Sequence, residues 1–313
     1  MEPLFFEPVM QERIWGGTRL SSFGYELSSD KTGECWAFSA HPNGPSVVKQ
    51  GSYKGLSLAD LWKEQRALFG HLPGETFPLL TKILDANDDL SVQVHPDDTY
   101  ANEHENGELG KTECWYIIDC DEDATLIFGH NAQSKEELEK MIDEGDWDEL
   151  LSVVNIKKGD FFYVPSGTVH ALCKGTLVLE TQQNSDTTYR LYDYNRKDAS
   201  GNERELHLEK SKDVITVPFA PEQLSFEKKH IDGATITTFV KNGYFSVDKW
   251  EIQGLAPFEQ THPFLLCSAI EGQGTLSHNG KKYAVKKGDH FLLPAEFGAF
   301  ELEGELELIV SHV

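Results

Sequence analysis

An internal repeat constrains the fold of this chain more than any other feature of its sequence. The segment "KKGDFFYVPSGTVHAL" begins at Lys157, and "KKGDHFLLPAEFGAFEL" begins at Lys286. Both read KKGD-x-F-x-x-P, at a constant offset of 286 − 157 = 129 residues. A Gly-Asp turn, a four-residue strand, a proline turn and a further strand form one hairpin-like unit. Two copies of this unit predict two related β-barrel domains.

Two segments interrupt the predicted strands with a helical pattern. "SLADLWKEQRALFG" begins at Ser57, which caps the helix, and ends at Gly70. "SKEELEKMIDEGDW" begins at Ser134, where Ser134 and Glu137 are predicted to form a capping box. A third short segment, "DWDELL", is expected to continue this helical insertion. We therefore expect a mainly β fold with helices inserted in or before the first barrel, and domains over residues 1–210 and 211–313.

The net charge of −24 argues against nucleic acid or an anionic membrane as a partner. It leaves room for a small anionic substrate, which would need lysine or arginine close to its site. No apolar run approaches the roughly 18 residues that a membrane helix needs. The acidic, proline-broken start "MEPLFFEPVM" is unlike a signal peptide, and the five cysteines include no C-x-x-C pair. These features predict free thiols and a cytoplasmic protein.

Polar residues occupy strand positions where apolar residues would be expected. In "SVQVHPDD", Val92 and Val94 face one side, and Ser91, Gln93 and His95 face the other. Taken alone, this pattern favours a solvated strand face. The "DD" of this segment is assigned to an ordinary turn after the strand.

Two further segments of the first repeat add potential metal ligands. "KTECWYII" supplies Glu113, whose strand face also carries Trp115 and Ile117, and "SGTVHAL" supplies His170. Taken singly, Glu113 is a charged residue beside a lysine, and His170 a hydrogen-bonded core histidine. Together with His95 they predict a site for Zn²⁺ or a similar divalent ion.

The second repeat differs from the first at the position that corresponds to this histidine. Ala299 stands where the first copy has His170, and Phe297 and Phe300 flank it. We therefore expect the second barrel to be filled with apolar side chains and to hold no metal. The remaining histidines, His290 among them, are assigned to loops, turns or polar stretches.

A polar segment, "LVLETQQNSDTTYRLYDYNR", follows the first repeat from residue 177 to residue 196. Alternation places Val178, Glu180 and Gln182 on one face of its strand. Arg190 follows a polar turn. Such an arginine pairs with a surface carboxylate or serves an anionic substrate, and the residues alone leave both open.

The ordered segments "FPLLTKILDANDDLSVQVHPDD", "GKTECWYII", "GTVHAL" and "ETQQNSDTTYRLYDY" together resemble type I mannose-6-phosphate isomerase in its short bacterial form. "RIWGG" and "GECWAFSAHPNG" fit the same family. The resemblance covers most of the chain and is dense from Phe77 to Arg196. It implies a double cupin fold, one Zn²⁺ per chain in the first cupin domain, and a degenerate second domain without metal.

The resemblance also implies roles for individual residues. The family's metal ligands fall on Gln93, His95, Glu113 and His170. Its catalytic arginine falls on Arg190, its substrate-contacting serine and lysine on Ser91 and Lys111, and a pocket glutamate on Glu180.

The reaction so implied interconverts mannose 6-phosphate and fructose 6-phosphate through a cis-enediol, whose developing oxyanion needs positive charge. Arg190 and the zinc are expected to supply it, and Lys111 and Ser91 to hold the substrate. Glu180, a zinc-bound water or Lys111 could carry the proton. An Fe²⁺ cupin oxygenase and a non-catalytic sugar-binding cupin are the alternatives. The sequence leaves open the oligomeric state, the metal loaded in the cell and the tolerance for other phosphorylated aldoses.

Overall fold

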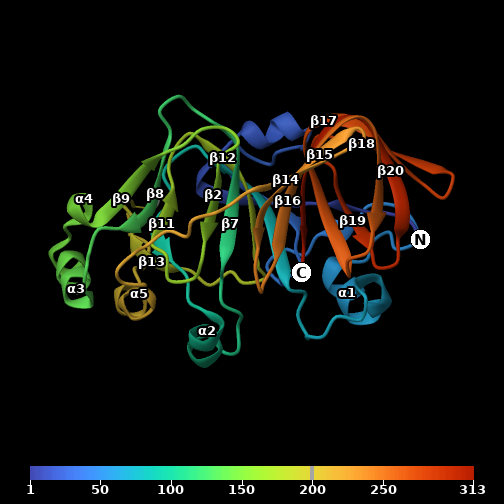
Figure 1. The fold of residues 1–313 in the computed structure, drawn as a ribbon. Coiled ribbons are helices and arrows are strands. Elements are labelled where there is room, and N and C mark those ends of the chain that lie inside the picture. The colour runs from blue at the N-terminus through green and yellow to red at the C-terminus, as the bar shows by residue number, and fades with distance from the viewer. Residues whose placement is uncertain (198–200) are drawn as a thin grey trace.

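The computed structural model describes residues 1–197 and 201–313 of the chain. Its strands form three sheets, and Figure 1 shows the two halves of the molecule lying side by side. The expected mainly β, double cupin architecture is confirmed, although the sheets are open and do not close into barrels. No helix among the described residues is long and apolar enough to cross a bilayer.

Two sheets face each other in the N-terminal half. The six-stranded sheet has the order β10 (Phe161–Val164), β7 (Glu113–Cys120), β12 (Thr176–Gln183), β5 (Leu79–Ala86), β3 (Thr32–Phe38) and β2 (Val9–Gly17). The five-stranded sheet has the order β13 (Tyr189–Tyr192), β6 (Val92–Val94), β11 (His170–Leu172), β8 (Thr125–His130) and β9 (Leu151–Asn155). Apolar side chains from both sheets, including Trp115, Leu126 and Val178, form one cluster between them.

The C-terminal half is built on one nine-stranded sheet. Its order is β14 (Glu227–Ile231), β15 (Ala234–Lys241), β16 (Ser246–Gln260), β20 (Gly298–His312), β17 (Phe264–His278), β19 (His290–Pro294), β1 (Leu4–Glu7) and β4 (Val47–Val48), and β18 (Lys281–Lys286) pairs with β17. The N-terminal strand thus joins the C-terminal sheet, where Phe6 lies opposite His290. The division at residues 210 and 211 stays a proposal, and β1 and β4 cross it.

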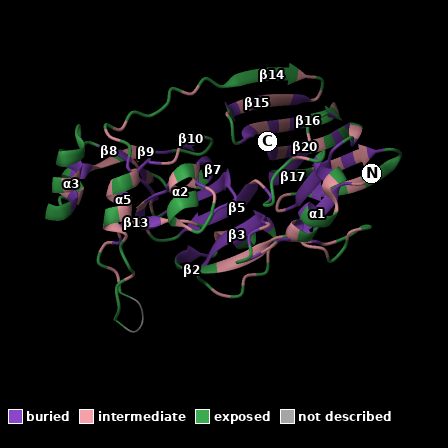
Figure 2. Cartoon of the chain, turned by 90° about the horizontal axis from the view of Figure 1, so that it is seen from below, coloured by how far each residue is buried: buried purple, intermediate pink, exposed green. Residues whose placement is uncertain are grey.

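The helices cover the outside of the sheets, and their exposed faces appear green in Figure 2. They are α1 (Leu58–Glu64), α2 (Asp98–His104), α3 (Lys135–Glu144), α4 (Trp147–Leu150) and α5 (Leu208–Val214), with 3₁₀ turns η1 (Arg19–Phe23) and η2 (Arg66–Phe69). Leu138 and Ile142 of α3 and Leu150 of α4 join an apolar cluster with Val92 and Val94 of β6. These helices therefore bury the outer face of the five-stranded sheet.

The predicted helix ends are confirmed with three corrections. Ser57 and Asp60 form a capping box at α1, but the helix ends at Glu64 and a 3₁₀ turn completes the segment. Ser134 accepts from the Glu137 amide at α3, yet the Glu137 carboxylate accepts from Gln133, so the predicted box is only half formed. The turn predicted for "DD" begins a helix, because the Asp97 side chain caps α2.

The two repeats share the same turn in atomic detail. Asp160 accepts a hydrogen bond from the Lys157 amide, and Asp289 accepts one from the Lys286 amide, each at 2.9 Å. Gly159 and Gly288 adopt positive φ angles of 90° and 88°, a conformation that glycine tolerates best. The strands that follow, β10 and β19, begin at Phe161 and His290. The repeat read from the sequence is thus one structural unit used twice.

Candidate active site

The candidate site lies between the two sheets of the N-terminal half. β6, β11 and β13 run side by side, and their register places His170 and Arg190 on either side of Gln93. On the facing sheet, Glu180 lies opposite Lys82 on one neighbouring strand and opposite Trp115 on the other. Each row presents polar side chains to the space between the sheets, as the alternation of the strands predicts.

His95, Glu113 and His170 converge at the inner end of this space. One potential ligand atom from each lies within 4.8 Å of the others, and all three side chains are buried. Nε2 of His95 lies 3.5 Å from Oε2 of Glu113, and Nε2 of His170 lies 3.3 Å from Oε1. The structure therefore brings the three predicted ligand residues together from separate segments.

Hydrogen bonds to the backbone determine which ring nitrogen of each histidine keeps a lone pair for a ligand. Nδ1 of His95 donates to the Thr187 carbonyl, and Nδ1 of His170 donates to the Thr168 carbonyl, both at 2.9 Å. Because a carbonyl only accepts, Nδ1 carries the hydrogen and Nε2 keeps its lone pair. Burial lowers the pKa of His95 well below its ordinary value and that of His170 to about 3. Both rings are therefore neutral, and each Nε2 accepts a hydrogen bond, from Lys111 in His95 and from Gln93 in His170.

This donor set fits a divalent metal ion. Buried Oε1 of Glu113 accepts no hydrogen bond from the described residues, although burial raises the pKa of this carboxyl group to about 7. The ammonium of Lys111 contacts both Glu113 and, at 3.0 Å, Nε2 of His95, so the cluster already attracts a cation. Two imidazoles and one carboxylate with carbonyl-oriented rings are typical of metal sites. The amide nitrogen of Gln93 lies 3.3 Å from Nε2 of His170, within reach of the same point.

A cavity of about 310 Å³ adjoins this cluster through Gln93 and Lys111, which contact the histidines and line the cavity. Ser91, Gln93, Lys111, Glu180 and Arg190 line it, so the structure gathers the remaining predicted site residues in one place. The roles assigned to them from the sequence stay predictions.

The Glu180 carboxylate has one hydrogen-bonded and one unbonded oxygen. Trp115 Nε1 donates to its Oε2 at 2.9 Å, and Oε1 lies 3.4 Å from the Lys82 ammonium. Burial pushes the pKa of Glu180 upward, but Lys111, Lys82 and the Trp115 hydrogen bond outweigh this and lower it. Glu180 is therefore an ionised carboxylate in the wall of the cavity.

Several cavity residues were not predicted from the sequence. They are Arg13, Trp15, Glu34, Lys82, Leu90, Asp186, Thr188 and Arg204. Lys82 could have been predicted as a site residue, because it interrupts the apolar strand "LLTKILDA" as Gln93 interrupts its own strand. Glu34 lies in "GECWAF", which carries the family resemblance but suggested no role. Arg204 had no signal, because the sequence around it shows no strand or helix period and only the fold places it at the cavity.

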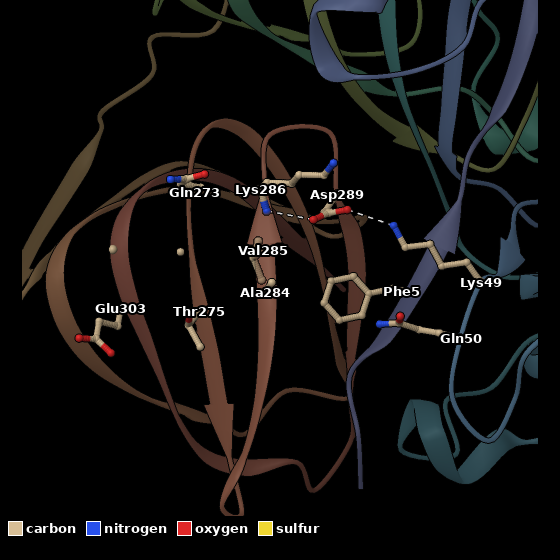
Figure 3. A pocket seen from close by; sticks show the side chains of 12 residues that line it. Phe5, Lys49, Gln50, Gln273, Thr275, Ala284, Val285, Lys286, Asp289 and Glu303 are labelled. Atoms are coloured by element: carbon tan, nitrogen blue, oxygen red, sulfur yellow. Dashed lines mark hydrogen bonds and ion pairs between the residues drawn. The ribbon is translucent and has the colours of Figure 1, made fainter.

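The second half of the molecule has a different interior. Phe297 and Phe300 are buried in an apolar cluster, as expected around Ala299. A hollow of about 580 Å³ there is lined by Gln273, Thr275, Glu303 and the Lys49–Asp289 ion pair (Figure 3). Among the described residues, the group of histidine, cysteine and carboxylate side chains close enough to share a metal lies in the N-terminal half. The absence of metal from the second half stays a prediction.

Sequence models of one enzyme family match both halves. Residues 4–118 match phosphomannose isomerase type I, catalytic domain, and residues 235–313 match mannose-6-phosphate isomerase, cupin domain. Mannose-6-phosphate isomerase ManA of Bacillus subtilis (strain 168) is 63% identical over 312 residues, covering 100% of this chain and 99% of its own. Mannose-6-phosphate isomerase of Streptococcus mutans is 54% identical over 312 residues, with 99% and 98% covered.

Solved structures agree with these relatives. The crystal structure of mannose 6-phosphate isomerase from Bacillus subtilis matches with a TM-score of 0.98 at 56% identity and covers 100% of both chains. A variant of phosphomannose isomerase from Salmonella typhimurium matches with a TM-score of 0.81 at 15% identity, covering 100% of this chain and 99% of its own. At that identity the second match shows the shared fold alone.

Proposed function

The chain belongs to the mannose-6-phosphate isomerase family, and from this premise we propose that it interconverts mannose 6-phosphate and fructose 6-phosphate by using one zinc ion and a cis-enediol intermediate. The observation that carries the proposal is the convergence of His95, Glu113 and His170 next to a cavity whose wall holds Glu180 and Arg190. Lys111 and Gln93 line this cavity and contact the cluster.

We assign the metal to His95, Glu113 and His170, with Gln93 as the fourth ligand. Their nitrogen and oxygen donors, three of them on buried side chains, are those that zinc takes. A bound divalent ion would polarise the substrate's carbonyl and hydroxyl oxygens. Sharing of the Nδ1 protons with backbone carbonyls keeps both Nε2 atoms ready for the metal.

The reaction moves a proton between C2 and C1 of the open-chain sugar. Glu180 is the protein base in this proposal, because it is ionised and its Oε1 accepts no hydrogen bond from the described residues. Trp115 holds its other oxygen in place. A base on one side of the sugar can serve both carbons, as a cis-enediol requires.

Arg190 supplies positive charge where the enediolate oxygens develop. Its Nη1 donates to the Glu205 carbonyl at 2.8 Å, while buried Nε finds no partner among the described residues. A guanidinium held in this way, with an unsatisfied donor, is suited to a developing oxyanion. Lys111, next to Glu113 and His95, is assigned to the substrate's hydroxyl groups, together with Ser91.

We also propose a cytoplasmic location, in line with five free cysteines. A coupled assay for fructose 6-phosphate, run with zinc-loaded protein and mannose 6-phosphate, tests the function. Ketose formation is expected. Its absence would favour the sugar-binding or oxygenase alternatives.

A further inference from the structure

We propose that Arg204, positioned by the buried carboxylate of Asp193, determines the enzyme's specificity for a phosphorylated sugar by binding the substrate's phosphate group. This inference rests on the proposed function. It adds a phosphate-binding residue to Lys111 and Ser91, which the sequence analysis assigned to holding the substrate.

The fold places Arg204 beside Arg190. The His207 amide donates to the Arg190 carbonyl at 2.8 Å, and the Arg190 amide donates to Nδ1 of His207 at 3.1 Å. The Arg190 side chain donates to the Glu205 carbonyl. Residues 204–207 therefore run alongside β13, and both arginines line the same cavity.

Asp193 fixes the orientation of the Arg204 guanidinium. Nε of Arg204 donates to Oδ2 of Asp193 at 2.7 Å, and Nη2 donates to Oδ1 at 2.6 Å. This two-point geometry uses one edge of the guanidinium and leaves Nη1 for another acceptor. Arg196 also pairs with Asp193, whose side chain is only 5% exposed. One buried carboxylate thus serves two guanidinium groups.

Lysine and carboxylate charges balance each other at the end of the cavity next to the proposed metal ligands. At the Arg204 end, arginines outnumber carboxylates. Lys111 contacts Glu113, and Lys82 pairs with Glu180, so each inner lysine has its own carboxylate. At the other end, Arg190 and Arg204 line the cavity, and the carboxylate that binds Arg204 also binds Arg196 outside the cavity. The charge of Arg204 adds to burial in lowering the pKa of Arg190, so the two guanidinium groups repel each other. A dianionic phosphate would relieve this repulsion.

The cavity wall carries an excess of positive charge, although the protein as a whole is strongly acidic. Five cationic side chains line it (Arg13, Lys82, Lys111, Arg190 and Arg204), against three anionic ones (Glu34, Glu180 and Asp186), in a chain of net charge −24. The excess is therefore local, as recognition of an anion in an acidic protein requires.

The test is steady-state kinetics of Arg204→Gln in the zinc-loaded enzyme. KM for mannose 6-phosphate should rise about 10- to 100-fold, as loss of a charged hydrogen bond predicts, with kcat within about 3-fold. Competitive inhibition by inorganic phosphate should weaken in parallel. Arg204→Lys should recover part of the loss, since it keeps the charge without the two-point contact.

Arg196→Gln is the matched control, because Arg196 binds the same carboxylate but does not line the cavity. Its KM should stay within about 3-fold of wild type. An unchanged KM and phosphate inhibition in Arg204→Gln, or equal effects of both variants, would overturn the assignment while wild-type activity still supported the proposed function. Inactivity of the wild type would instead refute the proposed function itself.

Discussion

Lys82 on β5 and Glu180 on β12 face each other directly across neighbouring strands, with Nζ and Oε1 3.4 Å apart and each side chain 5% exposed. The pair lies in one row with Trp36 and Trp115. The Lys82 ammonium sits 5.2 Å from the Trp36 ring, and Trp115 donates to Glu180. An ion pair in this position holds the proposed base in its charged state.

Replacement of Lys82 by methionine should strongly destabilise the protein. Replacement removes the ion-pair partner of the buried Glu180 carboxylate, and loss of one partner of a buried ion pair typically costs about 3–5 kcal/mol. The double variant Lys82→Met/Glu180→Gln should lose less. Urea unfolding of the zinc-loaded protein measures both. Lys140→Met is the control, because Lys140 pairs with Glu144 on the exposed surface and its loss should cost at most about 0.5 kcal/mol. Equal stability of Lys82→Met and this control would contradict the account.

Replacement of His95 or His170 by alanine should abolish both zinc binding and isomerase activity, because each variant loses a metal–nitrogen bond. Gln93→Ala should be milder, since water can take the place of the amide. Elemental analysis of the purified variants gives the metal content. A full zinc complement in both histidine variants would refute the ligand assignment.

Arg190→Ala should keep its zinc and its fold but lose about 10²–10³-fold in kcat, the usual effect of removing one oxyanion partner. Arg190→Lys should recover only part of this, because an ammonium cannot reproduce the guanidinium geometry. Steady-state kinetics on metal-loaded protein separates this role from that of Arg204. If Arg190→Ala changed KM alone, Arg190 would bind substrate without acting on the transition state.

His290 should make the stability of the protein depend on pH. Burial lowers its pKa to about 3, and its two ring nitrogens lie 3.0 Å from Ser268 Oγ and 2.6 Å from Tyr25 Oη. Between its ordinary value of about 6.5 and about 3, the unfolded chain binds a proton that the folded chain does not, so stability falls as pH falls. This residue alone should remove about 2 kcal/mol between pH 7 and pH 5.

The test for His290 measures the unfolding free energy of the wild type and of His290→Gln as a function of pH. His290→Gln cannot take up the proton, so its unfolding free energy should fall less steeply over this range. Other buried histidines contribute equally to both proteins and cancel. Parallel profiles for wild type and variant would show that His290 does not carry the effect.

Much of the fold and site follows from local sequence signals. The repeated turn is visible because Gly159, Asp160 and their counterparts must recur for the turn to form. Gln93, Glu113 and His170 stand out because polar residues in buried strands need partners. Lys82 carried the same signal and was overlooked.

Other features depend on contacts that no local pattern encodes. His290 was assigned with other histidines to loops, turns or polar stretches. This was wrong, because His290 lies in β19, whose pairing with β1 and β17 buries it completely. The pairing of β1 with the C-terminal sheet joins residues more than 280 positions apart. The position of Arg204 at the cavity likewise depends on tertiary contacts, with Asp193 and alongside Arg190.

The most direct test is to follow mannose 6-phosphate with the zinc-loaded wild-type enzyme in D₂O by proton NMR. The account predicts that fructose 6-phosphate appears and that a fraction of it carries solvent deuterium at C1, because a protein base moves the proton through an enediol. Failure of the zinc-loaded enzyme to form any fructose 6-phosphate would contradict the proposed function, and ketose formed without any deuterium at C1 would contradict the proton-transfer mechanism.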